Sequence, residues 1–538
     1  MPKPAVVRLT LALALAFAAT TRAQSVESPR LDTGQISGVL VEKEGAAPIR
    51  AFKGIPFAAP PVGDLRWKPP QPVAAWEGVR ACDTFGPVCP QPAVPFFVVP
   101  GPRSEDCLYL NVWTGAGDPG AKLPVMVWIH GGSLIFGAGS QGLYDGAPLA
   151  RRGVVVVTLN YRLGPFGFLA HPALSKESPQ GVSGNYGLLD QIAALEWVKR
   201  NVAAFGGDPG CVTIFGESAG GGSVQALLLS PLAKGLFHRA IVQSPVWTAP
   251  PLRGGAPGVE SAEAAGERFA AAIGVTGDEP LAALRAKTAP ELLAASAGPP
   301  EVGTTSGVTF GLCADGVAIP ADPVELVAAG KQADVPLLIG TTADEGTLFV
   351  GTIRTRADLT KAIEGMFGAQ APMVAEAYPA KSDGEAKRVA ARILADSIFV
   401  APTRAFVRAR PGFTSKAWLY AFTRAPMAGR LLGLGAHHGC ELGYVFETLD
   451  APGAMGIQPL DRTLAATVSA AWVRFARTGD PSGEGLPEWP AYTVENDAHL
   501  ELGDKVQPGS GLRKAQCDLL EKVWAEKTTA RPAERRVF

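Results

Sequence analysis

The stretch VTIFGESAGGGSV, residues 212–224, places a serine between two glycines directly after a run of apolar and β-branched residues. The spacing of Gly216, Ser218 and Gly220 fits the G-x-S-x-G motif, in which small neighbours allow a sharp strand-to-helix turn with the serine oxygen at its apex. An unreactive serine in a tight turn has the same pattern. The rest of the chain must therefore supply partners for Ser218 before the motif indicates chemistry.

The segments on either side of this stretch alternate between strand and helix patterns. LPVMVWIHGG (123–132) and GVVVVTLNYR (153–162) are apolar runs bounded by glycine, which are typical of strands covered on both faces. The spacing becomes helical over 187–205 and strand-like over 207–216, and VPLLIGTT (335–342) has the composition of another strand. This alternation predicts an α/β fold with a large, mostly parallel central sheet flanked by helices.

Three further stretches, 258–301, 358–399 and 463–478, are rich in Ala, Glu and Leu at helical spacing. We expect them to form helices that cover the sheet and cap the active site. The chain contains no internal repeat and no long low-complexity linker. Residues 24–538 are therefore predicted to form a single domain, which long α/β chains often do.

The first 23 residues have the features of a secretory signal peptide. Lys3 and Arg8 precede the apolar run LTLALALAFAA (9–19), and TRA then leads to Gln24. The run is shorter than the roughly 20 residues that a transmembrane helix needs. We therefore expect export, with the mature protein either periplasmic or secreted and without a membrane span.

Composition and charge narrow the choice of partner. With 47% apolar and 18% charged residues, the chain has the composition of an ordinary globular protein with a large core. Loss of residues 1–23 removes three basic side chains and changes the formal net charge from −1 to −4. This surface gives no electrostatic reason to expect nucleic acid or an anionic membrane as partner, so we expect a small-molecule substrate. The oligomeric state stays open.

A serine nucleophile needs a histidine base within hydrogen-bonding reach, and in α/β-hydrolases the histidine follows both the serine and the acid in the chain. Only His238, His437, His438 and His499 follow Ser218. His238 comes too soon after the serine for a strand carrying the acid to lie between them. His499 lies in a polar segment near the C-terminus. The remaining choice is between His437 and His438.

The acid is expected at the carboxyl end of a strand, where α/β sheets collect their functional groups. The strand VPLLIGTT is followed by ADEG, which places Asp344 and Glu345 at such an end. Spacing alone does not choose between these two acids.

Longer motifs do distinguish them, because the chain resembles the type B carboxylesterase and cholinesterase family of α/β-hydrolases over nearly all of its mature length. The resemblance is carried by GIPFAAPPVGDLRW (54–67), SEDCLYLNVW (104–113), LNYRLGPFGFL (159–169), GNYGLLDQIAALEWVKRNVAAFGGDP (184–209), GESAGGGSV (216–224) and HHGCELGYVF (437–446). It implies an exported serine carboxylesterase that hydrolyses carboxylic esters through an acyl-enzyme on Ser218. It further implies Glu345, the residue before glycine in DEG, as the acid and His438, the histidine of HGxE, as the base. Neither a metal nor a cofactor is implied.

The resemblance also places the oxyanion hole. The backbone amides of Gly132, Ser133 and Ala219 would bind the carbonyl oxygen, and Gly131 would shape the turn. The commoner form of this loop has a third glycine where Ser133 stands. Because a serine still has a backbone amide, we expect an altered acyl pocket rather than a lost oxyanion hole.

The cysteines and the segment between them bear on substrate choice. The family's first disulfide maps onto Cys89 and Cys107, which leaves Cys82 over among an odd total of seven cysteines. In cholinesterases the corresponding loop carries a tryptophan that binds a quaternary ammonium. Here the segment has Phe96 and Phe97 but no Trp or Tyr, so we expect poor hydrolysis of choline esters.

Several alternatives stay open at this stage. Glu217 is either a second functional carboxylate or a buried structural one, and Ser244 is expected to support the histidine from behind. Cys440, two residues after His438, has no nucleophile motif around it, and we expect it to pack. The fold also serves catalytically inactive adhesion proteins, which usually lack a triad residue, and lipases and amidases use the same triad.

Overall fold

The computed structural model describes residues 28–94, 97–246, 248–255, 259–277, 279–296, 307–410, 412–450 and 456–530. The predicted signal peptide and Phe96 lie outside these residues, as does part of the helical stretch predicted at 258–301.

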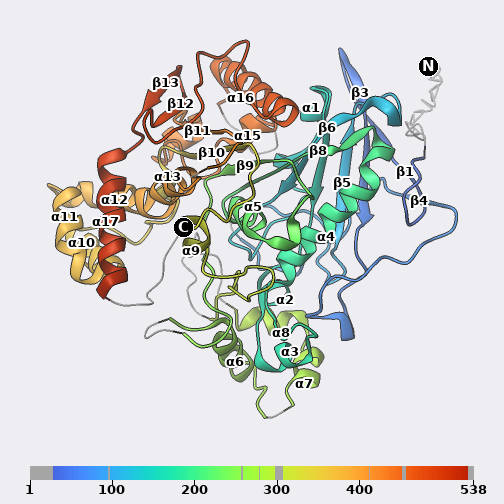
Figure 1. The fold of residues 1–538 in the computed structure, drawn as a ribbon, viewed down its shortest axis with the longest axis horizontal. Helices are drawn as coiled ribbons and strands as arrows, with labels where there is room; N and C mark the ends of the chain where they lie inside the picture. Colours follow the sequence, from blue (N-terminus) through green and yellow to red (C-terminus); the bar gives the residue numbers. More distant parts are fainter. Residues whose placement is uncertain are drawn as a thin grey trace, which may run out of the picture.

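One large mixed sheet runs through the molecule (Figure 1). In the described part of the chain, eleven strands follow the order β13-β12-β11-β10-β9-β8-β6-β7-β5-β3-β2. The strands from β12 to β7 in this order pair in parallel, and antiparallel pairs occur only at the two ends. The predicted mostly parallel sheet is confirmed. The strands are β2 (Val39–Lys43), β3 (Ala46–Pro56), β5 (Tyr109–Thr114), β6 (Leu123–Ile129), β7 (Val155–Leu159), β8 (Gly207–Glu217), β9 (Arg239–Gln243), β10 (Leu337–Thr342), β11 (Ala417–Phe422), β12 (Ala498–Leu502) and β13 (Val506–Ser510), with a separate parallel pair of β1 (Gln35–Ser37) and β4 (Val79–Ala81).

Helices cover both faces of this sheet, as the alternation of side chains along β6 shows. Val125 and Val127 belong to one apolar core, whereas Met126 and Trp128 belong to another on the opposite face. The first core includes α4 and α5, and the second includes α1, α15 and α16. The helices are α1 (Ala147–Arg151), α2 (Gly164–Phe168), α3 (Pro172–Glu177), α4 (Tyr186–Asn201), α5 (Ala219–Leu229), α6 (Ala262–Ala272), α7 (Leu281–Ala286), α8 (Ala289–Ala294), α9 (Pro323–Ala328), α14 (Met427–Leu431), α15 (Leu442–Val445) and α16 (Pro459–Thr478).

A third apolar core joins a group of helices beside the sheet, seen at the left of Figure 1. These helices are α10 (Arg356–Phe367), α11 (Ala371–Ala377), α12 (Asp383–Leu394) and α17 (Lys514–Ala530). A π-helix, Ala395–Val400, continues α12 and leads into α13 (Ala401–Arg408). A side chain at Gly346 would overlap the carbonyl oxygen of Ala391, so α12 lies directly against the segment that follows β10.

The segment around His499 differs from its prediction as a polar region. It forms β12, which pairs in parallel with β11 and antiparallel with β13. Its apolar residues Leu500 and Leu502 are fully buried, and His499 is only 9% exposed. The polar residues of this segment suggested an exposed region. They alternate with buried apolar residues, however, which is the period-two pattern of a strand.

Candidate active site

Ser218 stands at the turn between a strand and a helix, as its motif predicts. β8 ends at Glu217 and α5 begins at Ala219. Ser218 itself has φ 57° and ψ −126°, a backbone conformation that residues other than glycine rarely adopt and that costs on the order of 1–3 kcal/mol. The Ser218 amide donates to the carbonyl oxygen of Gln243 at 3.0 Å, which ties the strained residue to the neighbouring strand β9.

Glycine is required around this turn because backbone segments approach one another closely. A side chain at Gly220 would overlap the carbonyl oxygen of Ile129, at the end of β6. A side chain at Gly216 would lie 2.5 Å from the carbonyl oxygen of Gly220. The first turn of α5 is thus packed directly onto the ends of β6 and β8.

The strand-to-helix turn at residues 216–220, with Ser218 at its apex, is called the elbow below. The residues predicted for the oxyanion hole follow β6 and lie beside it. A Cβ atom at Gly131 would be 3.1 Å from the Cβ of Ser218. Gly132 and Ser133 then turn sharply, with φ of 100° and 57°. Ala219 is the first residue of α5, so its amide has no acceptor within the helix. The role of Gly132, Ser133 and Ala219 as donors remains a prediction.

Glu345 and His438 form a close polar pair. Glu345 begins the 3₁₀-helix Glu345–Leu348 after β10 and is fully buried. One of its carboxylate oxygens lies 2.5 Å from Nδ1 of His438. The other accepts hydrogen bonds from the amide of Thr342 at 2.6 Å and from the hydroxyl of Ser244 at 2.5 Å. Ser244 therefore supports the acid rather than the histidine directly.

The two residues that spacing could not exclude have other contacts. Asp344 accepts a hydrogen bond from the amide of Ala436 at 2.9 Å and so holds the loop before the histidines. Nδ1 of His437 lies 3.0 Å from the carbonyl oxygen of His438. The geometry thus favours Glu345 and His438 as the acid and base.

The second ring nitrogen of His438 faces a carboxylate oxygen of Glu217. Nε2 lies 3.1 Å from a carboxylate oxygen of Glu217, and no hydrogen bond joins it to Ser218 within the described residues. Burial alone would lower the pKa of His438, but the negative charges of Glu217 and Glu345 outweigh it and raise that pKa to about 10. The two carboxylates therefore favour the protonated form of His438. Catalytic hydrogen bonds are often incomplete before substrate binds.

Two phenylalanines that sequence reasoning missed hold the ring of His438. Phe399, from the π-helix, has its ring centroid 4.8 Å from that of His438, and Phe349 lies at 5.6 Å in an edge-on arrangement. A π-helix shifts the side chains of a helix relative to its ordinary register and often occurs at functional sites. No local signal predicts this contact, because Phe399 and His438 come from separate elements.

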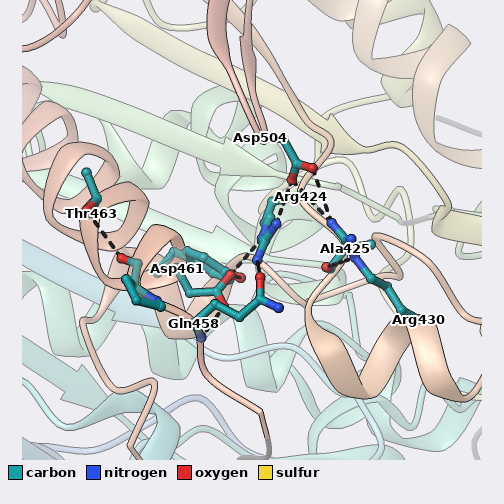
Figure 2. A network of polar contacts seen from close by, with 9 residues as sticks. Arg424, Ala425, Arg430, Gln458, Asp461, Thr463 and Asp504 are labelled. Carbon is teal, nitrogen blue, oxygen red and sulfur yellow. Dashed lines mark hydrogen bonds and ion pairs between the residues drawn. The ribbon is translucent and has the colours of Figure 1, made fainter.

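A buried arginine anchors the start of the loop that carries His438 (Figure 2). Arg424 comes just after β11 and is only 2% exposed. Its guanidinium donates to Asp461 Oδ1, Gln458 Oε1 and Asp504 Oδ1, each at 2.7 Å. Gln458 is the N-cap of α16, and Asp504 belongs to the turn between β12 and β13. One side chain thus joins its own segment to the start of α16 and to the turn between β12 and β13.

The predicted disulfide between Cys89 and Cys107 is not formed in this structure. Both residues are free thiols, as is Cys82. Cys89 and Cys107 are nevertheless neighbours, since a hydrogen bond to Cys89 together with burial raises the pKa of the Cys107 thiol. The family motif therefore predicted the proximity correctly, while the covalent bond is absent. Cys440 is also free and partly buried.

Within the ranges given above, no group of three or more His, Cys, Asp or Glu side chains could hold a metal ion. No described helix is both long and apolar enough to cross a bilayer.

The chain matches a known enzyme family over most of its length. The family model described as "Carboxylesterase family" matches residues 25–520. The chain belongs to this family. It is a serine hydrolase that acts on carboxylic ester bonds, and it has the α/β-hydrolase fold.

Individual relatives agree with this assignment. The fumonisin B1 esterase of Sphingopyxis macrogoltabida is 40% identical over 505 residues, which cover 91% of this chain and 89% of that protein. The para-nitrobenzyl esterase of Bacillus subtilis (strain 168) is 39% identical over 493 residues, covering 86% and 96%. A solved structure of a thermophilic PNB esterase superimposes with a TM-score of 0.79 at 37% identity, covering 92% of this chain and 99% of the other.

Proposed function

We propose that the protein is an exported carboxylesterase that cleaves small carboxylic esters through an acyl-enzyme on Ser218. The observation that carries the proposal is the buried Glu345–His438 pair, with 2.5 Å between Oε2 and Nδ1, beside a serine held at φ 57° on a strand-to-helix turn. A strained, glycine-flanked serine next to a carboxylate-bound histidine is the arrangement that serine hydrolases use.

The reaction proceeds in two halves. The Ser218 oxygen attacks the ester carbonyl while Nε2 of His438 takes its proton, which forms a tetrahedral oxyanion. The amides of Gly132, Ser133 and Ala219 bind that oxyanion, and the alcohol leaves with the proton from His438. Water then attacks the acyl-enzyme by the same route, which releases the carboxylic acid and restores the Ser218 hydroxyl.

The hydrogen bonds of Glu345 explain how the base is oriented. Glu345 accepts a hydrogen bond from Nδ1–H, which leaves Nε2 of His438 as the nitrogen that exchanges a proton with the serine. The donors Thr342 and Ser244 hold the carboxylate of Glu345 in place. The charge of Glu217 opposes the neutral form of His438 that the first step requires, so its contact with Nε2 has to loosen before attack.

Replacement of Ser218 by Ala tests the assignment directly. Hydrolysis of a short nitrophenyl ester should fall by several orders of magnitude, to what binding and the oxyanion donors alone supply. Circular dichroism and thermal unfolding of the variant should match those of the wild type. Full activity in a folded Ser218→Ala variant would disprove the role of Ser218.

Substrate choice is the next question. We propose small esters with an uncharged alcohol, since the loop between Cys89 and Cys107 offers no Trp or Tyr for a quaternary ammonium. The names of the two bacterial relatives suggest para-nitrobenzyl esters and fumonisin B1 as substrates to include. A panel of acyl chain lengths with matched amides and a choline ester separates an esterase from a lipase, an amidase or a cholinesterase.

Export rests on the N-terminal sequence alone. Mass spectrometry of the protein recovered outside the cytoplasm of producing cells should show Gln24 as the first residue. Recovery of the chain only in the cytoplasm, with residues 1–23 intact, would refute this part of the proposal.

A further inference from the structure

A cavity is lined by residues from the end of α11, from α12 and from the start of α17. These helices lie beside the sheet, at the left of Figure 1. The cavity has a volume of about 130 Å³, smaller than the roughly 300–1,000 Å³ of pockets that hold drug-sized ligands. Three arginines line it: Arg388 and Arg392 from α12, and Arg513 from the turn just before α17. Nothing in the ester-hydrolysing site described above requires these side chains.

The three guanidinium groups differ in how far their charges are balanced. Arg388 and Arg392 lie one turn apart on α12, and Arg388 has a loose ion pair with Glu385 at 3.4 Å. Arg513 is bound by Asp396. Arg392 has no ion pair or side-chain hydrogen bond to any other described residue. The lining therefore carries an excess of positive charge centred on Arg392.

Two of the lining groups are fixed in position before any ligand arrives. Asp396 accepts hydrogen bonds from Arg513 Nε at 2.8 Å and from the hydroxyl of Tyr378 at 2.8 Å, and Tyr378 also lines the cavity. Because their orientation is already set, a ligand would not bear the entropy cost of ordering them. Gln516, in the first turn of α17, adds an amide group to the wall.

We propose that this cavity binds a small oxyanion with two or more negative charges, such as a phosphate or a polycarboxylate. Guanidinium groups are rigid, multidentate donors that match the oxygens of carboxylates and phosphates. The chain as a whole has a formal net charge of only −1, so it has no general excess of positive charge that would collect anions over its surface. Binding therefore depends on this local cluster of arginines.

The test is isothermal titration of the full-length folded protein with inorganic phosphate and, separately, with citrate. Sodium chloride at matched ionic strength is the control for screening. We expect saturable binding of phosphate, citrate or both to the wild type, accompanied by a rise in the unfolding temperature with ligand concentration. A preference for one probe identifies carboxylate or phosphate chemistry.

Matched variants locate the binding. Arg392→Gln should weaken it about 10-fold, the loss expected for one charge-assisted contact, and the double variant Arg388→Gln/Arg392→Gln should abolish it. Arg356→Gln, an exposed arginine at the start of the neighbouring α10, should bind as the wild type does. All of these side chains are exposed, so the variants should unfold at the wild-type temperature in chloride.

Three results would overturn the proposal. They are binding by the double variant equal to that of the wild type, no saturable binding of either probe by the wild type, and an equal response to chloride at the same ionic strength. None of these outcomes depends on ester hydrolysis, so failure of the anion site can be distinguished from failure of the proposed function.

Discussion

The two sides of the active site are built in different ways. The elbow side is a short continuous segment in which β8, Ser218 and α5 follow one another, with Gly216 and Gly220 allowing the close approach. The acid and base side is assembled from distant segments. Glu345 follows β10 and His438 follows β11, and their contacts come from Ser244 and the π-helix.

This difference explains where the sequence is informative. A local turn is set by residues a few positions apart, and a short motif records it. A histidine held by side chains far away in the chain leaves no such record. The elbow should therefore be sensitive to steric changes, and the acid and base side to the loss of single polar or aromatic contacts.

The largest effect is expected when the acid is neutralised. Glu345→Gln keeps the shape but no longer favours the Nε2-reactive form of His438, so kcat should fall by about 10⁴-fold, as in other triads. Asp344→Asn is the matched control, because Asn can still accept the hydrogen bond from Ala436. Steady-state hydrolysis of a nitrophenyl ester measures both. A larger loss in Asp344→Asn would reverse the assignment.

Addition of a methyl group at Gly220 tests how closely the elbow is packed. Gly220→Ala would overlap the carbonyl oxygen of Ile129, and overpacking of this kind costs about 1–3 kcal/mol of unfolding free energy. Displacement of Ser218 by about 1 Å would lower kcat/KM by about 100-fold. Gly365→Ala in α10 is the control, since nothing lies within 4 Å of its Cβ position. Equal stability and activity in both variants would show that the elbow is not tightly packed.

Removal of the aromatic contact should have a smaller effect. Phe399→Ala leaves the ring of His438 free to turn on one side, so kcat should fall by roughly 10-fold, about the worth of one aromatic pair, with KM little changed. Phe399→Leu, which retains apolar bulk, should recover part of the rate. If KM alone changes, Phe399 lines the substrate pocket and does not position the histidine.

The smallest effect on maximal rate is expected at Glu217, where the pH profile changes instead. Glu217 raises the pKa of His438, and only neutral His438 is a base, so kcat/KM of the wild type should rise with pH into the alkaline range. Glu217→Gln removes one negative charge and should move this acid limb about 1 unit or more to lower pH. Glu196→Gln, on the exposed side of α4, should leave the limb unchanged.

Whether a feature could be predicted from the sequence depends on how far apart in the chain its interacting residues lie. Alternating apolar runs predicted the parallel sheet, because a strand buried on both faces needs them, and the elbow followed from its glycines. The family motifs then selected Glu345 over Asp344, and the structure pairs Glu345 with His438. Two contacts of His438, with Glu217 and with Phe399, could not be predicted, because both depend on how separate segments pack.

The most direct test of the account is covalent labelling of the enzyme with a phosphonate ester, followed by peptide mass spectrometry. Such a compound resembles the tetrahedral intermediate and stays attached to a serine nucleophile. We expect one label per chain, on Ser218, in proportion to the activity lost, and none in Ser218→Ala. Stoichiometric inactivation with the label on any other residue would contradict it.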